Sequence, residues 1–138
     1  MRKVITVGVF DYFHLGHLRL FENCKKYGDY LIVAVQDGDF ILKYKPNATV
    51  LYSTEERIEL VKSLRVVDEV VVYQSICPDF MKTIDFDVFA VGEDQTAERF
   101  MLTAAWCEEN GKDVVWMKRT PGICSSNIKS ELNPTERG

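Results

Sequence analysis

Long hydrophobic runs are absent from this chain of 138 residues, in which no apolar segment approaches the ~20 residues that a helix needs to cross a bilayer. Residues 1–3 lead directly into an apolar, strand-like segment, without the hydrophobic region of a signal peptide. Both absences argue against a membrane-spanning or secreted protein. We therefore expect a cytoplasmic protein that does not insert into a membrane.

Clusters of metal-binding side chains are also lacking. The chain has only two histidines, and its four cysteines form no C-x-x-C pair. Structural zinc sites use such ligands at short spacings, so we expect no metal site built from the protein's own side chains. Reduced thiols are typical of a cytoplasmic protein. The cysteines are Cys24, Cys77, Cys107 and Cys124.

An excess of positive charge is missing as well. The 17 Lys and Arg residues are outnumbered by 21 Asp and Glu, which gives a net charge of −4. No general attraction to nucleic acid or to an anionic membrane is expected from this balance. A polyanionic ligand must therefore be held by a local basic cluster.

The length and composition fit a single globular domain. We expect it to occupy residues 1–132, followed by a polar tail at 133–138. Apolar, β-branched runs alternate with helix-like segments, and their continuous rather than alternating pattern indicates strands buried on both faces. This rhythm predicts an α/β fold, a Rossmann-like doubly wound domain with a five-stranded parallel sheet that binds ligands beyond the carboxyl ends of its strands. The predicted strands are residues 4–9, 30–35, 70–73, 88–91 and 114–117, and the predicted helices lie near 16–28, 54–64, 77–83, 96–110 and 125–132.

Local signals support two of these helices. Ser53 and Glu56 form a capping-box pattern at the start of the second helix. Gly111 follows the fourth helix, at the position where a glycine commonly ends one.

Residues 37–52 form the longest stretch without a predicted element, and such loops tend to be functional. Lys43 and Lys45 lie two residues apart within it, so in an extended segment both side chains would point the same way. Two ammonium groups on one side suit a triphosphate or a phosphorylated substrate, although simple solvation is the alternative.

The most informative segment is residues 8–17, which contains both histidines. A strand, a glycine-punctuated turn and a helix follow one another here, a geometry that presents backbone N–H groups to an anion. We expect Gly8 to allow close approach of a phosphate and Gly16 to expose N–H groups at the helix start. His14 and His17 are then expected to contact a phosphate that undergoes chemistry; a purely structural role is the alternative.

This segment reads G-x-F-D-x-x-H-x-G-H and resembles the signature of the cytidylyltransferases and their nucleotidyltransferase relatives. In that family the two motif histidines contact the nucleotide triphosphate. Val9 stands where close relatives usually carry threonine, so the backbone N–H must serve alone there. Asp11 is expected chiefly to fix the shape of the turn.

Three more segments carry the resemblance. Residues 65–70 resemble the R-x-V-D-E-V element of glycerol-3-phosphate-type cytidylyltransferases, with Val66 replacing an aromatic residue. Residues 119–129 resemble R-T-x-G-I-S-T-T-x-I-K and predict a second phosphate-binding helix start. Residues 92–95 correspond to a G-D-D-W segment that lines the nucleoside pocket, with Gln95 replacing the tryptophan. An ordinary solvated turn is the alternative for this acidic segment.

Arginines at positions 57 and 65 lie eight residues apart on one predicted helix, close to the same face. Each guanidinium can grip phosphate oxygens in bidentate fashion, so both could reach one anion if the helix persists as far as residue 65. A surface ion pair is the alternative for Arg57.

Pattern and resemblance together assign three groups of site residues. The expected catalytic residues are His14, His17, Lys43 and Arg119. The expected nucleotide-binding residues are Gly8, Val9, Phe10, His14, Gly16, His17, Arg65, Gly92, Glu93, Asp94, Arg119, Ile123, Ser125 and Ser126. The expected substrate-binding residues are Lys43, Lys45, Arg57 and Asp11.

The resemblance implies an enzyme that transfers CMP from CTP to a phosphorylated small alcohol, with Mg²⁺ bound alongside the triphosphate, and it implies a homodimer. Polyol phosphates are the favoured acceptors. Phosphocholine or phosphoethanolamine is the alternative, because Tyr12, Phe13 and Tyr44 offer aromatic faces for a cation. Two other functions stay open: an adenylyltransferase that uses ATP on a sugar phosphate or FMN, and a non-catalytic domain that binds a phosphorylated metabolite.

Overall fold

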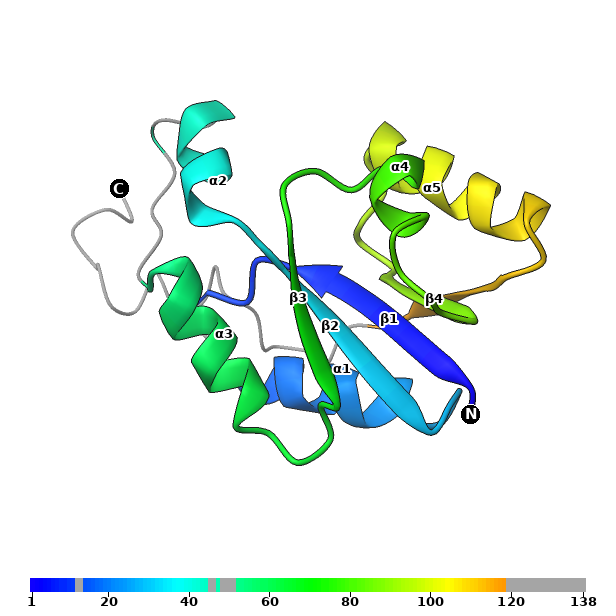
Figure 1. Cartoon of the computed structure of the whole chain (residues 1–138), viewed down its shortest axis with the longest axis horizontal. Helices are drawn as coiled ribbons and strands as arrows, with labels where there is room; N and C mark the ends of the chain where they lie inside the picture. The colour runs from blue at the N-terminus through cyan, green and yellow to red at the C-terminus, as the bar shows by residue number, and fades with distance from the viewer. Residues whose placement is uncertain (12–13, 45–46, 48–51, 119–138) are drawn as a thin grey trace.

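The computed structural model describes residues 1–11, 14–44, 47 and 52–118. Its centre is a sheet of five parallel strands in the order β3-β2-β1-β4-β5 (Figure 1), which confirms the predicted doubly wound α/β fold. The strands are β1 (Lys3–Gly8), β2 (Tyr30–Gln36), β3 (Glu69–Tyr73), β4 (Val88–Gly92) and β5 (Asp113–Met117). The helices are α1 (Leu15–Cys24), α2 (Gly38–Tyr44), α3 (Thr54–Lys62), α4 (Pro78–Met81) and α5 (Glu98–Glu109).

Both faces of the sheet are covered, which explains the continuous apolar runs of the strands. On one face, Phe21 of α1 and Val61 of α3 pack with Val4, Val33 and other strand residues. On the other face, α4 and α5 cover the alternate strand residues, with Met81, Phe100 and Cys107 in that core cluster. Figure 1 shows the same division, with α1 and α3 apart from α4 and α5.

Strand β1 lies at the point where the strand order reverses. Its pairing with β2 continues to the end of the strand, at Gly8↔Val35. Its pairing with β4 stops earlier, at Thr6↔Ala90. In folds of this kind, ligands bind in the crevice beyond the carboxyl ends of the strands at such a switch point. The site is therefore expected where β1 and β4 separate.

The local helix signals are confirmed. Ser53 and Glu56 form the capping box of α3, with each side chain accepting from the other's backbone N–H. Gly111 follows α5 with a φ of 76°, in the left-handed region that glycine adopts without strain.

One expectation about the long irregular stretch is wrong. Residues 38–44 form α2, with Asp39 in its first turn and Ile41 buried beneath it. Lys43 therefore lies in the last turn of a helix rather than in an extended segment. The two-residue spacing of Lys43 and Lys45 therefore no longer implies that both side chains point the same way. Lys45 itself lies outside the described residues.

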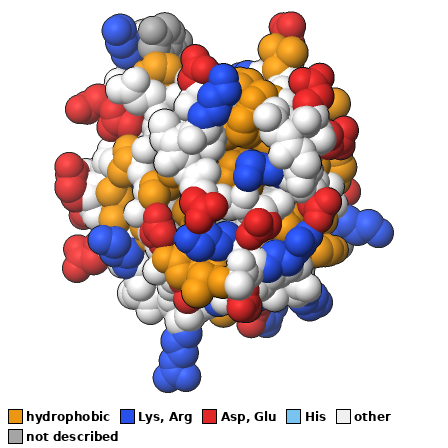
Figure 2. All heavy atoms as spheres, turned by 45° about the vertical axis from the view of Figure 1, so that its right-hand side comes forward, with side chains coloured by type: hydrophobic (Ala, Val, Ile, Leu, Met, Phe, Trp, Pro, Cys, Tyr) orange, Lys and Arg blue, Asp and Glu red, His pale blue; other side chains and the backbone are white. Residues whose placement is uncertain are grey.

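Basic and acidic side chains are interspersed on the face of the molecule seen in Figure 2, as the modest net charge suggests. In the part of the chain that the structure describes, no helix is long and apolar enough to cross a membrane. The predicted helix near 125–132 and the tail at 133–138 lie outside that part.

Candidate active site

The turn after β1 is shaped by one buried aromatic ring. Phe10 has a φ of 55°, a backbone conformation rarely adopted by residues other than glycine. Its ring folds back over Gly8, where an added Cβ would lie 2.8 Å from the ring atom Cζ. Gly8 therefore makes room for the Phe10 ring, and the close approach of a phosphate to Gly8 stays a prediction.

The same ring supports the second histidine. Phe10 meets His17 edge-on, with ring centroids 5.5 Å apart, and Phe21 of α1 packs on it at 5.2 Å. The strained backbone of Phe10 thus places an apolar support beneath an imidazole at the start of α1.

The two histidines form the N-terminal cap of α1. The His14 Nδ1 accepts a hydrogen bond from the Gly16 N–H at 3.0 Å. In return, the His14 N–H donates to the His17 Nδ1 at 3.2 Å, which completes a capping box. The rings stack with centroids 3.9 Å apart. Serine or threonine with glutamate or glutamine usually makes this motif; here two imidazoles do.

These cap bonds fix which ring nitrogens carry hydrogen. Because each Nδ1 accepts from a backbone N–H, a neutral His14 or His17 carries its hydrogen on Nε2. Burial and, to a smaller extent, the neighbouring His14 lower the pKa of His17 to about 4. His17 is therefore a neutral Nε2–H donor at pH 7, beside the positive end of a helix dipole.

Asp11 is almost fully buried, and its carboxylate accepts the Tyr52 N–H at 3.0 Å. It thus ties the turn after β1 to the segment that precedes α3. This agrees with its expected role in fixing the turn, and it does not favour the substrate contact also considered for it.

Arg57 is fully buried and grips the protein itself. Its Nη1 donates to the Val9 carbonyl at 2.8 Å and to the Gln36 carbonyl at 2.7 Å. Its Nε donates to the Tyr52 carbonyl at 3.3 Å, and Nη2 to the Thr54 hydroxyl at 3.3 Å. Burial lowers the pKa of this guanidinium. The expected substrate contact is therefore corrected: Arg57 holds together three segments at the carboxyl edge of the sheet.

Arg65 is not beside Arg57. Helix α3 ends at Lys62, and the exposed Arg65 follows it, close to the start of β3. Nearby Asp68 accepts the Leu31 N–H at 2.8 Å, which places this turn at the amino edge of the sheet. The helix that was expected to carry both arginines stops too early, so the prediction that they reach one anion is wrong.

The turn after β4 lies beside the turn after β1. Glu93 and Asp94 are exposed, and the Glu93 N–H donates to the Met117 carbonyl of β5 at 2.8 Å. Gln95 points back toward the sheet, where its amide contacts the backbone of both β1 and β4. Sequence reasoning identified the position as a departure from tryptophan and missed this bridge.

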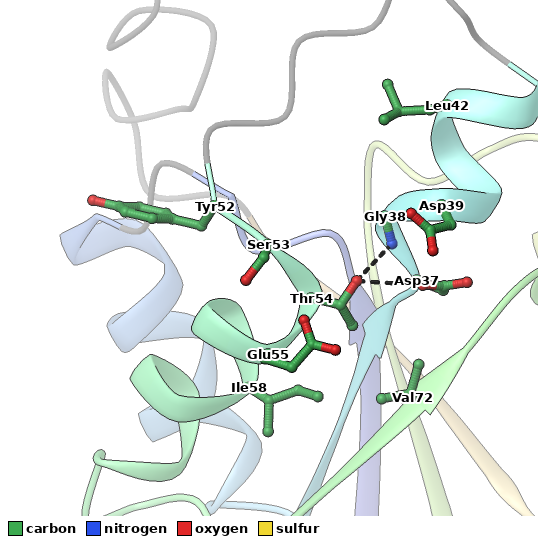
Figure 3. Close-up of a pocket in the computed structure, with 10 residues that line it drawn as sticks. All are labelled: Asp37, Gly38, Asp39, Leu42, Tyr52, Ser53, Thr54, Glu55, Ile58 and Val72. Carbon is green, nitrogen blue, oxygen red and sulfur yellow. Dashed lines mark hydrogen bonds between the residues drawn. The ribbon is translucent and has the colours of Figure 1, made fainter.

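A cavity of about 430 Å³ lies beside α2 and the start of α3 (Figure 3). The Thr54 hydroxyl accepts from the Gly38 N–H at 2.9 Å and lies 3.3 Å from an Asp37 carboxylate oxygen. Three carboxylates make this cavity a poor match for a triphosphate, which the start of α1 suits better. The lining residues are Asp37, Gly38, Asp39, Leu42, Tyr52, Ser53, Thr54, Glu55, Ile58 and Val72.

Several expected site residues cannot be placed. The predicted helix of the second phosphate motif lies outside the described residues, as do Tyr12 and Phe13 of the first motif. Within the described ranges, His, Cys, Asp and Glu side chains form no group of three or more that could hold a metal ion. The unplaced site residues are Tyr12, Phe13, Lys45, Arg119, Ile123, Ser125 and Ser126.

A parallel sheet with a switch point, and a helix start capped by two imidazoles, together define a nucleotide-binding α/β protein. Residues 5–131 match the family described as Cytidylyltransferase-like, and the chain belongs to that family.

Named relatives agree with this assignment. The chain is 37% identical over 134 residues to the glycerol-3-phosphate cytidylyltransferase of Bacillus subtilis, covering 96% of this chain and 98% of the relative. It is also 37% identical over 95 residues to the FAD synthase of Thermococcus sibiricus, covering 67% of this chain and 64% of that protein. Among solved structures, the lipopolysaccharide core biosynthesis protein of Thermoplasma volcanium matches with a TM-score of 0.70 and 25% identity, over 87% of this chain and 97% of that one.

Proposed function

We propose that this protein is a CTP-dependent cytidylyltransferase that transfers CMP from CTP to glycerol 3-phosphate or a related polyol phosphate, releasing pyrophosphate. The observation that carries the proposal is the pair of stacked imidazoles that caps α1 at the switch point of the sheet. Similarity to a glycerol-3-phosphate cytidylyltransferase along nearly the whole chain supports the choice of nucleotide and acceptor.

The reaction forms one P–O bond and breaks another. An oxygen of the acceptor phosphate attacks the α-phosphorus of CTP, while the bond from that phosphorus to the oxygen bridging toward the β-phosphate breaks and pyrophosphate leaves. The acceptor phosphate is already ionised at neutral pH, so no general base is needed. Catalysis then consists of aligning the two groups in line and stabilising the charge that develops.

His14 and His17 are suited to stabilising the charge that develops. Their Nε2–H groups are fixed as donors by the cap bonds on Nδ1, and α1 adds its positive dipole end. A neutral imidazole of this tautomer donates its Nε2–H to a phosphate oxygen. Phe10 keeps the His17 ring in place from below.

Basic and hydroxyl-bearing residues complete the proposed site. Lys43, at the end of α2, and Lys45, which follows it in the sequence, bind the phosphates. Arg119, Ser125 and Ser126 form the second phosphate-binding element. These roles rest on the family resemblance of residues 119–129 and on the position of Lys43 in the last turn of α2.

Mg²⁺ is proposed to arrive bound to the triphosphate. Mg²⁺ is commonly held mainly by phosphate oxygens and water, so this role needs no cluster of protein ligands. Bound there, Mg²⁺ would supply positive charge to offset that of the triphosphate. A homodimer and a cytoplasmic location are also proposed, on the basis of the resemblance and the composition.

An adenylyltransferase is the second candidate, favoured by the similarity to an FAD synthase over about two thirds of the chain. The test is a pyrophosphate-release assay with CTP, Mg²⁺ and a panel of phosphorylated alcohols. We expect turnover with glycerol 3-phosphate or another polyol phosphate. Turnover confined to phosphocholine or phosphoethanolamine would correct the acceptor. Tight CTP binding without turnover of any acceptor would instead indicate a non-catalytic binding domain.

A further inference from the structure

The crevice between β1 and β4 is bridged at its base by a side chain. The register of these strands runs from Val4↔Val88 to Thr6↔Ala90, yet β1 continues to Gly8 and β4 to Gly92. On its other side, β1 stays paired with β2 as far as Gly8. The two strands therefore part where a nucleotide is expected to enter.

The side-chain amide of Gln95 spans this gap. Its Oε1 accepts the Gly92 N–H at 2.9 Å, and its Nε2 donates to the Val7 carbonyl at 3.4 Å. The two contacts require opposite ends of an amide, one acceptor and one donor, which glutamine supplies in a single side chain. Gln95 thus links the end of β4 with the last residues of β1.

The turn that carries Gln95 is itself closely held. The Gln95 N–H donates to the Gly92 carbonyl at 2.9 Å. The Glu93 N–H donates to the Met117 carbonyl, which links the turn to β5. A Cβ on Gly92 would lie 2.9 Å from the Asp94 Oδ1 and 3.3 Å from the Gln95 Oε1. The lack of a side chain at Gly92 therefore lets the turn fold back over the strand end.

We propose that Gln95 is a positioning residue for the nucleotide, which holds the turn after β4 at a fixed distance from the turn that carries His14 and His17. Val7, which it contacts, lies immediately before the first residue of the histidine motif. A nucleotide in this crevice lies between both turns, so the bridge sets the width of its site. This inference rests on the proposed function for the identity of the nucleotide.

The first test is Gln95→Ala in the full-length enzyme. Loss of the bridge lets the two strand ends separate and weakens nucleotide binding in the ground state and in the transition state alike. We expect the KM for CTP to rise about 10-fold, equivalent to about 1.4 kcal/mol, with kcat within about threefold of wild type. The Kd for CTP alone, measured by calorimetry without acceptor, should rise by the same factor.

A second variant separates a bridge from a local cap. Gln95→Glu keeps an oxygen for the Gly92 N–H and has no N–H to offer the Val7 carbonyl. We expect it to behave like Gln95→Ala in KM. Wild-type KM in Gln95→Glu would mean that only the contact with Gly92 matters, and it would overturn the bridging role.

The matched control is Asn110→Ala, which removes another amide that donates to a backbone carbonyl, that of Trp106 at 2.8 Å, at the end of α5. It should leave the KM for CTP unchanged even where its thermal stability falls as much as that of Gln95→Ala. Equal changes of KM in both variants would show that general destabilisation is responsible, and would overturn the proposal.

The outcomes separate this inference from the proposed function. If the wild-type protein turns over ATP instead of CTP, the proposed function is wrong, and wild type and the Gln95 variants are then compared with ATP. A wild-type chain that binds CTP, with Gln95→Ala binding it equally well, removes the role of Gln95 alone. A wild-type chain that binds neither nucleotide removes both.

Discussion

At the scale of single residues, the state of one imidazole decides how this site works. His17 is held by a backbone N–H on Nδ1 and by the Phe10 ring beneath it. It is therefore a rigid hydrogen-bond donor rather than a mobile acid or base. A rigid donor aimed at a phosphate stabilises developing charge without reorganising during the reaction.

Replacing His17 by asparagine tests this role. The asparagine oxygen can take the place of Nδ1 and keep the cap on α1, while the Nε2–H is lost. We expect kcat to fall about 10²-fold, a loss of ~2.7 kcal/mol of transition-state stabilisation, with folding little changed. His17→Gln, which places an N–H near the Nε2 position, should retain more activity. Near-normal kcat in a folded His17→Asn protein would contradict the role.

The lowered pKa of His17 also predicts how stability depends on pH. An ordinary histidine titrates near 6.5, and burial lowers the pKa of this one to about 4. Between these values the unfolded chain binds more protons, so the stabilising contribution is complete above pH 6.5 and is lost as pH falls toward 4. We expect a loss of up to about 3 kcal/mol.

Urea unfolding of wild type and His17→Asn at pH 7 and pH 4.5 measures this loss. The wild-type protein should lose more stability on acidification than the variant, because only the wild type carries the buried His17 ring, which is protonated first in the unfolded chain. Parallel pH profiles of the two proteins would show that the His17 ring is not held neutral by the fold.

At the scale of elements, the segments that form the site are fastened by buried polar contacts. Arg57 of α3 binds carbonyls from the turn after β1, from the end of β2 and from the segment before α3. Asp11 adds a bond to the same segment. One helix therefore fixes the relative positions of two other elements.

Arg57→Lys should be strongly destabilising, because one ammonium cannot reach all the carbonyls that the guanidinium fork binds. Leaving buried acceptors without partners should lower the free energy of unfolding by about 2–4 kcal/mol. Chemical denaturation measures this change. Arg65→Lys is the matched control at an exposed position and should change stability by less than about 0.5 kcal/mol. Equal effects of the two substitutions would contradict the role given to Arg57.

The same elements show how far sequence reasoning reaches. All five strands are predictable, because short, continuous β-branched runs have few other secondary-structure assignments in a chain of this length. Helix α2 is not, because seven residues beside a lysine-rich stretch carry little periodic signal. Arg57 is misread for a similar reason: an arginine in a polar helix gives no sign of burial until β1 and β2 bring their carbonyls to it.

At the scale of the whole molecule, the sheet order brings together parts that are far apart in sequence. The histidine motif near residue 14 and the Gln95 turn become neighbours only because β4 lies beside β1. The sequence predicts that ligands bind at this edge, and the motif predicts which residues take part. The bridge across the strands depends on where the pairing of β1 and β4 ends, which sequence patterns do not reveal.

The choice of nucleotide is the most direct test of the account. The turn after β4, which the Gln95 bridge ties to β1, lies at the proposed nucleotide site. Hydrogen bonds can read the amine and carbonyl of a pyrimidine there, whereas a purine needs a deeper pocket. Sites built on buried hydrogen bonds can discriminate by up to ~10⁴-fold. The measurement is kcat/KM for CTP and for ATP, with Mg²⁺ and a saturating polyol phosphate acceptor. We expect CTP to be preferred by at least ~10²-fold. Equal use of the two nucleotides, or a preference for ATP, would contradict the account and identify an adenylyltransferase.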